Sequence, residues 1–402
     1  MKNINKYKYI ILGAGPSGLT FANKLLQSGE KSFIVLEKEA EAGGLCRSAL
    51  VDNAPLDFGG GHFLDVKRKE VLEFLFSFLP EKEWELHKRK STIITKGSEI
   101  DYPFESNIWQ LPTEDQIDYL LSISKTESGK KQMPKKFIDW IYWKLGDKIA
   151  VDYMIPYNEK VWSIDLNRLG TYWLYKLPDV SLRETLLSCL AKSPAGQMPA
   201  HAQFLYPKKY GYGEVWKRMA TALGDHIVYN FNVNNIEISS KTINNKYQAD
   251  IIINTIPWKE FKKSNIPSSI NSLINNLVHS SIRVSYYKDN FDSNAHWTYL
   301  PDIKLPHHRI LNRKNFCKNS RGYWTEMNEK RSNIKYELAD WKYTNSYAYP
   351  INTIKKPTEI KKILEFFEKK NIYGLGRWGE WEHMNSDVSV ERAIEVFNQI
   401  HK

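Results

Sequence analysis

The feature that most constrains this fold is a glycine-rich turn after the first apolar run. Residues 7–12 read YKYIIL, a β-branched and aromatic run that is typical of a buried strand. The turn GAGPSG follows at 13–18, and the next segment, LTFANKLLQSG, has helical spacing up to Gly29. A second apolar run, KSFIVLEK, contains Glu37 near its end. The order strand, glycine turn, helix, strand and acid predicts a Rossmann-type βαβ unit.

Each part of this unit has a mechanical role in binding a dinucleotide. Gly13 permits the tight turn out of the strand, Gly15 lets the backbone approach a diphosphate, and Gly18 lets the helix pack on the sheet. The N-terminus of the helix presents free N–H groups and a partial positive charge to the diphosphate. Glu37 follows at the spacing of an acid that bonds ribose hydroxyls. We therefore expect dinucleotide binding at this end of the chain.

A second glycine pair distinguishes a flavin from a nicotinamide dinucleotide. Residues 39–48 read EAEAGGLCRS, which resembles the flavoprotein pattern of a second glycine turn followed by an arginine near the cofactor. NAD dehydrogenases normally lack this glycine pair. The alternative interpretation is that Gly43 and Gly44 belong to an ordinary loop without a role in cofactor binding. A glycine loop that ends in a histidine, DFGGGHF, follows at 57–63. The sequence thus predicts FAD, and the candidate cofactor-binding residues are Gly13, Gly15, Ser17, Gly18, Glu37, Lys38, Gly44, Leu45, Arg47, Gly61, His62, Gly376 and Arg377.

Charge and cysteine content narrow the partners and the compartment. The formal net charge of +11 favours an anionic partner, although a lysine-rich solvated surface is the simpler explanation for most of it. No DNA- or RNA-binding signature appears, which leaves an anionic small substrate or weak contact with an acidic membrane surface. Three scattered cysteines without a CxxC pair argue against disulfides and structural zinc and indicate a reducing, cytoplasmic location. No run approaches the roughly 18 apolar residues of a membrane span.

The remaining pattern predicts an α/β protein with a discontinuous Rossmann-type FAD-binding domain, a mainly helical insertion and a substrate domain with a mixed sheet. An amphipathic helix at 135–144 is expected to face the core rather than a membrane. Strand character returns at 226–239 and 250–257. The expected boundaries are 1–75, 200–255 and 346–402 for the FAD-binding domain, 76–199 for the helical substrate domain and 256–345 for the sheet-containing substrate domain.

The last segment, VSVERAIEVFNQIHK, predicts a C-terminal helix with Ser386 or Asp387 as its N-cap. In FAD folds of this kind the final helix points its N-terminus at the isoalloxazine ring. Its dipole would there stabilise the anion of a reduced flavin.

A series of motifs in order along nearly the whole chain points further: GAGPSGL, EAGGLCRS, DFGGGHF, YPFESNIWQL, IPYNEKVWSI, FLYPKKYGYGEVW, HWTYLPD, HHRI, SYAYP and GRWGEWEHMNSD. They resemble the UDP-galactopyranose mutase family, more its eukaryotic-type branch than the usual bacterial one. PYNEKVW, GRWGEW and YPF are the more specific motifs. The resemblance implies an isomerase that interconverts pyranose and furanose forms of a nucleotide-diphosphate sugar for surface-glycan biosynthesis. Reduced flavin N5 would attack the anomeric carbon and form a covalent adduct without net oxidation.

The resemblance also implies roles for individual residues. His62 and Arg377 match the catalytic histidine and arginine beside the flavin, and Arg309 and Tyr349 match the groups that hold the diphosphate. An arginine suits this role because its planar fork pairs with phosphate oxygens and stays charged. The other matches in the substrate cleft are Asn158, Trp297, Tyr299 and Asn385.

Several positions depart from the family pattern. Lys176 lies where a family arginine is expected, His201 where an asparagine is expected, and His383 where a tyrosine is expected. Whether these residues replace the family groups stays open, and so do the identities of the sugar and the base and the oligomeric state. No second GxGxxG motif marks an independent NAD(P)H domain. NAD(P)H would therefore have to use the substrate cleft, or the reductant would come from another protein.

Simpler explanations stand beside these roles. His62 could be a packed loop histidine, and the HHR segment before Ile310 could be a solvated loop. Trp297 and Tyr299 share one strand face that could belong to the core rather than to a cleft. The competing functions are an oxidoreductase of the amine-oxidase or protoporphyrinogen-oxidase type and a flavin-binding protein without catalysis. The arginine and tyrosine set favours the mutase, because such oxidases want an apolar cavity.

Overall fold

The chain forms two compact units. Unit 1 comprises residues 1–85, 205–279 and 355–402, and unit 2 comprises 86–204 and 280–354. The three-domain boundaries expected from the sequence stay a prediction. The computed structural model describes residues 4–126, 132–176, 180–196, 202–261, 264–332 and 338–401.

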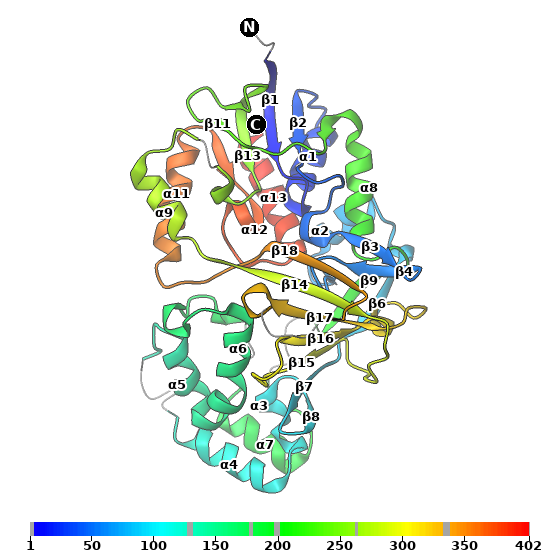
Figure 1. Ribbon diagram of the computed structural model, residues 1–402, viewed down its shortest axis with the longest axis vertical. Coiled ribbons are helices and arrows are strands. Elements are labelled where there is room, and N and C mark those ends of the chain that lie inside the picture. The colour runs from blue at the N-terminus through cyan, green and yellow to red at the C-terminus, as the bar shows by residue number, and fades with distance from the viewer. Residues whose placement is uncertain are drawn as a thin grey trace. The chain divides into compact units, whose positions relative to one another are not determined.

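Unit 1 is built on a sheet whose central strands are parallel (Figure 1). β1 (Asn5–Leu12) pairs in parallel with β2 (Phe33–Leu36) on one side and with β13 (Tyr247–Asn254) on the other. These strands carry near-continuous apolar runs because a parallel sheet is covered on both faces. The predicted strands at 7–12 and 31–38 are thereby confirmed. The other strands of this sheet are β10 (Ile227–Val228), β11 (Ile236–Glu237), β12 (Thr242–Ile243) and β19 (Ile372–Gly374).

The strand expected along 226–239 is only partly formed. β10 and β11 occupy its two ends, and residues 229–235 between them form no strand. Asn230 has a left-handed φ of 54°, and the N–H of Phe231 donates to the Glu37 carbonyl at 2.8 Å. The asparagine-rich segment thus crosses the end of β2 instead of extending beside it, because asparagine tolerates this conformation.

Helices of unit 1 pack on each other as well as on the sheet. α1 (Pro16–Gln27) begins at a proline, which is favoured in the first helical turn, and contacts α13 (Ser386–Ile400) through Phe21 and Phe397. The predicted N-cap of α13 is wrong by one residue. Asn385 holds the extended cap conformation, and Ser386 is already helical. The other helices and short strands of unit 1 are β3 (Ser48–Val51), β4 (Ala54–Asp57), β5 (Leu64–Asp65), α2 (Lys69–Phe76), α8 (Gly213–Leu223), α9 (Ser268–Asn276), α11 (Lys356–Glu368) and α12 (Gly376–Gly379).

Unit 2 combines a mixed sheet with a group of helices (Figure 1). The strand order is β18-β14-β17-β16-β15-β7-β8, mostly antiparallel. The strands are β7 (Ser91–Thr95), β8 (Ser98–Asp101), β14 (His279–Tyr287), β15 (Trp297–Tyr299), β16 (Arg309–Asn312), β17 (Tyr323–Asn328) and β18 (Trp341–Pro350). Two further strands, β6 (Trp84–Lys88) and β9 (Gln203–Pro207), include residues of both units.

The helices of unit 2 include the amphipathic helix that the sequence predicts at 135–144. It forms α5 (Phe137–Ile149), and Phe137, Trp140 and Ile141 are buried, so its apolar face belongs to the core as expected. Within the described ranges, no helix is long and apolar enough to cross a membrane. The other helices are α3 (Phe104–Asn107), α4 (Thr113–Ser124), α6 (Ile155–Trp162), α7 (Leu182–Ala191) and α10 (Arg313–Phe316).

A stability prediction follows from the packing of α1. A Cβ atom at Gly18 would lie 2.1 Å from the carbonyl oxygen of Gly13, a backbone atom that cannot turn away. We expect Gly18→Ala to lower the free energy of unfolding by about 1–3 kcal/mol, the usual cost of overpacking. Urea denaturation of the cofactor-free protein measures this loss. Gly15→Ala is the matched control, because its Cβ would meet no atom within 4 Å. Equal stability of both variants would contradict the prediction.

Candidate functional site

The first glycine turn leaves open space at the N-terminus of α1. A Cβ at Gly13 would lie 2.7 Å from Thr255 Oγ1, so neighbouring protein atoms explain that glycine. Gly15 has an ordinary φ of −78° and nothing within 4 Å of a Cβ, so no contact among the described residues explains it. As the N-cap of α1 it has no side-chain capping bond. The turn therefore offers free N–H groups beside a cradle that a Cβ would fill, and it fits a diphosphate.

The second glycine pair packs directly on the first turn. The Gly43 N–H donates to the Ala14 carbonyl at 2.8 Å, and a Cβ at Gly44 would lie 3.2 Å from the Gly15 Cα. Arg47 braces this turn, because its Nε donates to the Gly44 carbonyl at 3.0 Å. Close packing against the first glycine turn therefore explains why a glycine stands at 44, which an ordinary loop would not require. Leu45 follows it in a short 3₁₀ turn.

Glu37 lies at the end of β2 with a carboxylate that keeps spare acceptor capacity. It is buried and accepts backbone N–H bonds from Ala14 at 2.7 Å and from Glu39 at 2.9 Å. Burial raises the pKa of Glu37, and these two bonds oppose the rise. An ionised carboxylate can accept about four hydrogen bonds, so two ribose hydroxyls could still be bound. Lys38 is exposed and pairs with Glu39 at 3.8 Å.

The C-terminal segment returns to the start of α1. Gly376 has a φ of +74°, and a Cβ there would lie 2.0 Å from Ser17 Oγ. Only glycine allows this approach. Arg377 follows, and its Nη2 donates to the Met384 carbonyl at 2.7 Å. Asn385 occupies the N-cap position of α13 next to that carbonyl, without a side-chain capping bond. The fold therefore brings the predicted cofactor residues of both chain ends together, while direct contact of Arg377 with a flavin stays a prediction.

His62 lies at the end of the glycine loop and against an aromatic ring. A Cβ at Gly59 would lie 2.3 Å from His62 Cε1 and 2.2 Å from the Leu45 carbonyl, so the loop is tightly packed. The imidazole and the Tyr212 ring are nearly parallel at 12°, with centroids 6.2 Å apart. Gly61 precedes His62 and is half-buried. The half-buried imidazole fits either a role beside the cofactor or a packed loop histidine.

In unit 2, sheet register aligns a tyrosine, an arginine and a glutamate on three neighbouring strands. Arg309 on β16 lies opposite Tyr299 on β15 and opposite Glu326 on β17. Directly opposed residues share one face of an antiparallel sheet. Arg309 Nη2 lies 2.7 Å from the Glu326 carboxylate and donates to the Tyr349 hydroxyl at 3.3 Å. The alternative of a solvated HHR loop is therefore wrong, because Arg309 begins a strand and its charge is paired.

Burial makes this ion pair strong. Glu326 is fully buried, and burial is the largest influence and raises its pKa, but Arg309 and His308 together outweigh burial and lower the pKa of Glu326 to about 2. Burial also opposes the charge of Arg309, yet Glu326 and Tyr349 hold the pKa of Arg309 above its usual range. Neighbouring His308 is buried, which lowers its pKa. Arg309 Nε is buried and bonds no atom among the described residues, so one guanidinium donor is left over.

Aromatic side chains surround the ion pair within unit 2. The Tyr157 ring of α6 lies 5.6 Å from the Tyr299 ring, and the Trp162 ring lies 6.1 Å from that of Tyr349. Trp297 and Tyr299 are both buried. Arg89 contacts both residues, because its guanidinium lies 5.0 Å from the Trp297 ring and donates to the Tyr299 hydroxyl at 3.0 Å.

The other predicted substrate residues of unit 2 are Asn158, Lys176 and His201. The Asn158 amide is bonded inside α6, to the Met154 carbonyl at 2.8 Å and to Trp162 Nε1 at 2.9 Å, so it braces that tryptophan. Lys176 ends a short 3₁₀ turn, and its side chain lies outside the described part of the chain. His201 lies outside the described residues altogether.

Sequence reasoning missed several groups of this cluster. Glu326 belongs to none of the motifs, because its pairing with Arg309 depends on strand register. Arg89 and Tyr102 come from a separate segment, and Tyr102 lies in the YPF motif, 5.3 Å from Tyr299 between ring centroids. Tyr157 is the neighbour of Asn158 in PYNEKVW. Its ring packs on Tyr299, whereas the Asn158 amide is bonded within α6.

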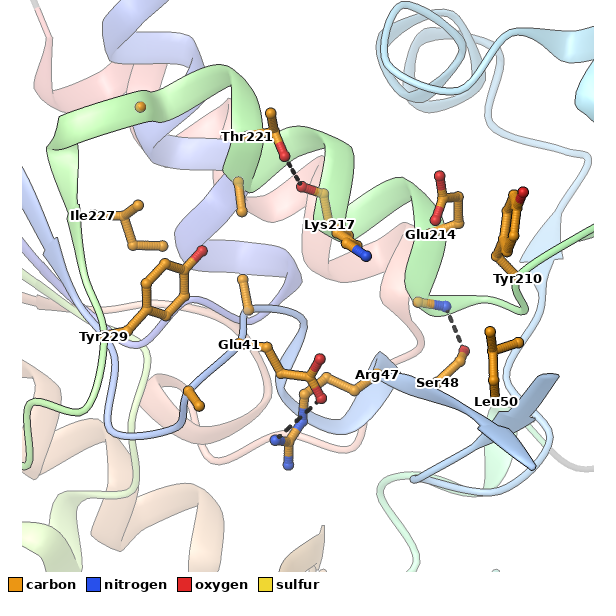
Figure 2. A pocket seen from close by; sticks show the side chains of 15 residues that line it. Glu41, Arg47, Ser48, Leu50, Tyr210, Glu214, Lys217, Thr221, Ile227 and Tyr229 are labelled. Atoms are coloured by element: carbon orange, nitrogen blue, oxygen red, sulfur yellow. Dashed lines mark hydrogen bonds and ion pairs between the residues drawn. The ribbon is translucent and has the colours of Figure 1, made fainter. Parts of the chain in front are cut away.

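Unit 1 also holds a cavity of about 460 Å³ between residues 40–50 and α8 (Figure 2). Arg47 is the one predicted cofactor residue in its wall, and it pairs there with Glu41 at 4.0 Å. In the part of the chain that the structure describes, no cluster of His, Cys, Asp or Glu could hold a metal ion. Burial raises the pKa of the Cys46 thiol to about 12, which argues against a nucleophilic role.

The two glycine turns, the acid after β2 and the parallel sheet define a dinucleotide-binding Rossmann fold of the flavoprotein type. Residues 11–78 match the family model of the NAD(P)-binding Rossmann-like domain. Over 99% of its length the chain is 22% identical to a protein of Mycoplasma genitalium named UDP-galactopyranose mutase, with 96% of that protein covered. The whole-length similarity confirms the resemblance to this family that the motifs indicate.

Solved structures show the same fold. A crystal structure of reduced UDP-galactopyranose mutase superposes with a TM-score of 0.87 at 23% identity, over 98% of this chain and 94% of that one. A proposed protoporphyrinogen oxidase from an Exiguobacterium species superposes with a TM-score of 0.72 at 12% identity, over 99% of both chains. The fold alone is therefore common to proteins named for different reactions.

The open cradle at Gly15 predicts a selective effect on cofactor binding. Gly15→Ala places a methyl group where the diphosphate would approach, and we expect FAD affinity to fall about tenfold or more, equivalent to ~1.4 kcal/mol. The stability of the cofactor-free protein should stay unchanged, since the methyl group meets no protein atom. Fluorescence titration of the apoprotein with FAD measures the affinity. Unaltered affinity would place the diphosphate elsewhere.

The buried ion pair predicts how stability depends on pH. The folded pKa of Glu326 is about 2 and its ordinary value is 4.5, so its contribution is complete above pH 4.5 and is lost as pH falls toward 2. Glu326→Gln should cost about 3–5 kcal/mol near pH 7, because the half-buried Arg309 guanidinium loses its counter-charge. Urea denaturation at pH 7, 5 and 3 should show the difference from the unsubstituted protein shrinking below pH 4.5. A constant difference over this range would contradict the pairing, and Arg309→Met/Glu326→Gln is the control that should recover most of the loss.

Proposed function

We propose that this chain is an FAD-dependent mutase that interconverts the pyranose and furanose forms of a nucleotide-diphosphate sugar. The similarity over the whole chain to proteins named UDP-galactopyranose mutase supports this reaction. The observation that carries the proposal is the buried Nε of Arg309, which bonds no atom among the described residues. It belongs to a guanidinium that bonds Tyr349 and lies in a cluster with Tyr157 and Tyr299. A half-buried guanidinium whose Nε bonds no atom among the described residues suits a phosphate oxygen, whereas an apolar substrate would leave that donor unpaired.

FAD would be held by the glycine turns of unit 1. Its diphosphate would lie at the N-terminus of α1 beside Gly15, and its ribose would bond Glu37. The segment around Gly376 closes against Ser17 at the same place. We assign His62 and Arg377 to the flavin side of the site. Reduced FAD would supply a nucleophilic nitrogen to the anomeric carbon of the sugar.

Residues of unit 2 would keep the nucleoside diphosphate bound while it is detached from the sugar. Arg309 and Tyr349 would bond its phosphate oxygens, so that the leaving group stays in place for its return. Glu326 would orient the guanidinium of Arg309. We further assign substrate contacts, directly or through their neighbours, to Asn158, Lys176, His201, Trp297, Tyr299 and Asn385. The proposed biological role is the supply of a furanose precursor for surface glycans.

The oxidoreductase alternative rests on the fold shared with the proposed protoporphyrinogen oxidase. It would call for an apolar substrate cavity, whereas the described cluster of unit 2 holds Arg89, Arg309 and Glu326.

An anaerobic assay separates the two functions. The purified protein would be reduced with dithionite under nitrogen and given UDP-galactose and other sugar nucleotides, and the products would be separated by chromatography. We expect pyranose and furanose forms to interconvert without net electron transfer, and the oxidised protein to be inactive. Turnover that consumes oxygen and needs oxidised flavin would overturn the mutase assignment in favour of the oxidase.

Tyr349→Phe is the sharpest single test of the diphosphate site. Arg309→Ala is less informative, because a loss of roughly 2–4 kcal/mol in nucleotide binding would include the cost of leaving Glu326 buried and unpaired. Tyr349→Phe removes one hydroxyl and keeps the ring. We expect nucleotide Kd to rise by roughly 10- to 150-fold, which corresponds to the ~1.5–3 kcal/mol of a hydrogen bond to a charged group, while FAD content is unchanged.

Isothermal titration with UDP measures this change. Tyr343→Phe, on the same strand β18, is the matched control and should bind UDP normally. Normal affinity of Tyr349→Phe would remove Tyr349 from the diphosphate site.

A further inference from the structure

The proposed function assigns no role to the motif FLYPKKYGYGEVW, yet its GYG segment meets a fully buried carboxylate of unit 1. Asp57, the last residue of β4, is completely buried. It accepts hydrogen bonds from Ser48 Oγ at 2.5 Å, from the Tyr206 hydroxyl at 3.0 Å and from the Tyr212 N–H at 3.2 Å. A buried carboxylate held by several fixed donors is a rigid anchor, because each lost donor would cost desolvation without compensation.

The two glycines of the GYG segment allow the backbone to reach this anchor. A Cβ at Gly211 would lie 2.6 Å from Ser48 Oγ, and a Cβ at Gly213 would lie 2.5 Å from the Ser48 N atom. The Gly213 N–H donates to Ser48 Oγ at 2.7 Å. Close packing at Gly211 and Gly213 and hydrogen bonds from Tyr212 and Gly213 therefore fix the backbone on both sides of Tyr212. This fixes the direction in which the Tyr212 side chain points.

The Tyr212 side chain lies beside one part of the proposed cofactor site and bonds another. It is fully buried, and its ring is stacked nearly parallel to His62. Its hydroxyl lies 2.6 Å from Ser386 Oγ in the first turn of α13. Trp84 and Trp216 meet the same ring at steep angles and close it in.

We propose that Tyr212 is a positioning residue, anchored through Asp57, that sets both His62 and the N-terminus of α13 relative to the flavin. The inference rests on the FAD site of the proposed function and not on the mutase reaction. The field of a helix terminus falls off within about one turn. A small displacement of the α13 N-terminus would therefore change the energy of a reduced, anionic flavin more than that of the neutral oxidised form.

The flavin midpoint potential tests this role, because a ring that only fills space is served equally well by phenylalanine. Tyr212→Phe keeps the ring against His62 and loses the bond to Ser386. We expect normal FAD content and a midpoint potential about 30 mV more negative, which corresponds to a tenfold loss of preference for reduced over oxidised flavin. Anaerobic reductive titration against a reference dye measures the potential.

Tyr9→Phe is the matched control. Tyr9 is a buried tyrosine of the same unit, and its hydroxyl lies 3.1 Å from His401 Nδ1, just beyond the opposite end of α13. This variant should keep the unsubstituted potential. Ser386→Ala removes the same bond as Tyr212→Phe from the other partner and should reproduce its shift, with no further change in Tyr212→Phe/Ser386→Ala.

The outcomes are distinguishable. An unchanged potential in Tyr212→Phe or Ser386→Ala, or an equal shift in Tyr9→Phe, would overturn the positioning role while leaving the proposed function intact. If Tyr212→Phe fails to fold, Ser386→Ala decides alone. Absence of bound flavin in the unsubstituted protein would overturn the FAD assignment, and the positioning role with it.

Discussion

The architecture of unit 1 depends on how closely three backbone segments approach the first turn of α1. Gly18 packs on the Gly13 carbonyl, Gly44 packs on Gly15, and Gly376 packs on Ser17. The approaches at Gly18 and Gly376, at 2.1 and 2.0 Å from a Cβ, are closer than a side chain would allow, and the one at Gly44, at 3.2 Å, is tight. Within this arrangement Gly15 is the glycine that protein contacts leave unexplained. Steric packing inside the chain thus accounts for most of the glycines, and the remaining one marks where a ligand would approach.

Unit 2 depends on a different constraint, the burial of charge. Removing Arg309 and Glu326 from water is costly, and a buried pair often contributes little net stability. What the pair supplies is orientation, because Glu326 holds the guanidinium on the sheet face beside Tyr349. The pair is neutral overall, which makes the burial of Arg309 tolerable before any ligand binds. The Nε of Arg309 bonds no atom among the described residues. Binding of a ligand by this donor would give a reason for the energetic cost of burying the pair.

Local sequence patterns predicted the parts of the fold that local physics determines. β1, α1, β2 and α5 follow from apolar periodicity and glycine placement. The strand expected at 226–239 failed because an asparagine-rich segment turns across the end of β2. Glu326 could not be found from sequence, since its partner lies on another strand and register is a property of the whole sheet. Asn158 was a plausible pocket residue, but its amide is bonded within its own helix.

The shared fold leaves chemistry to be decided by a few polar groups. Proteins named as a mutase and as a proposed oxidase superpose on this chain along nearly its full length, so the Rossmann unit cannot discriminate between them. A polar group is buried only where a partner offsets its desolvation. The half-buried Arg309, whose Nε bonds no atom among the described residues, is therefore a stronger argument about the substrate than the fold is, because an apolar substrate would leave that donor unpaired.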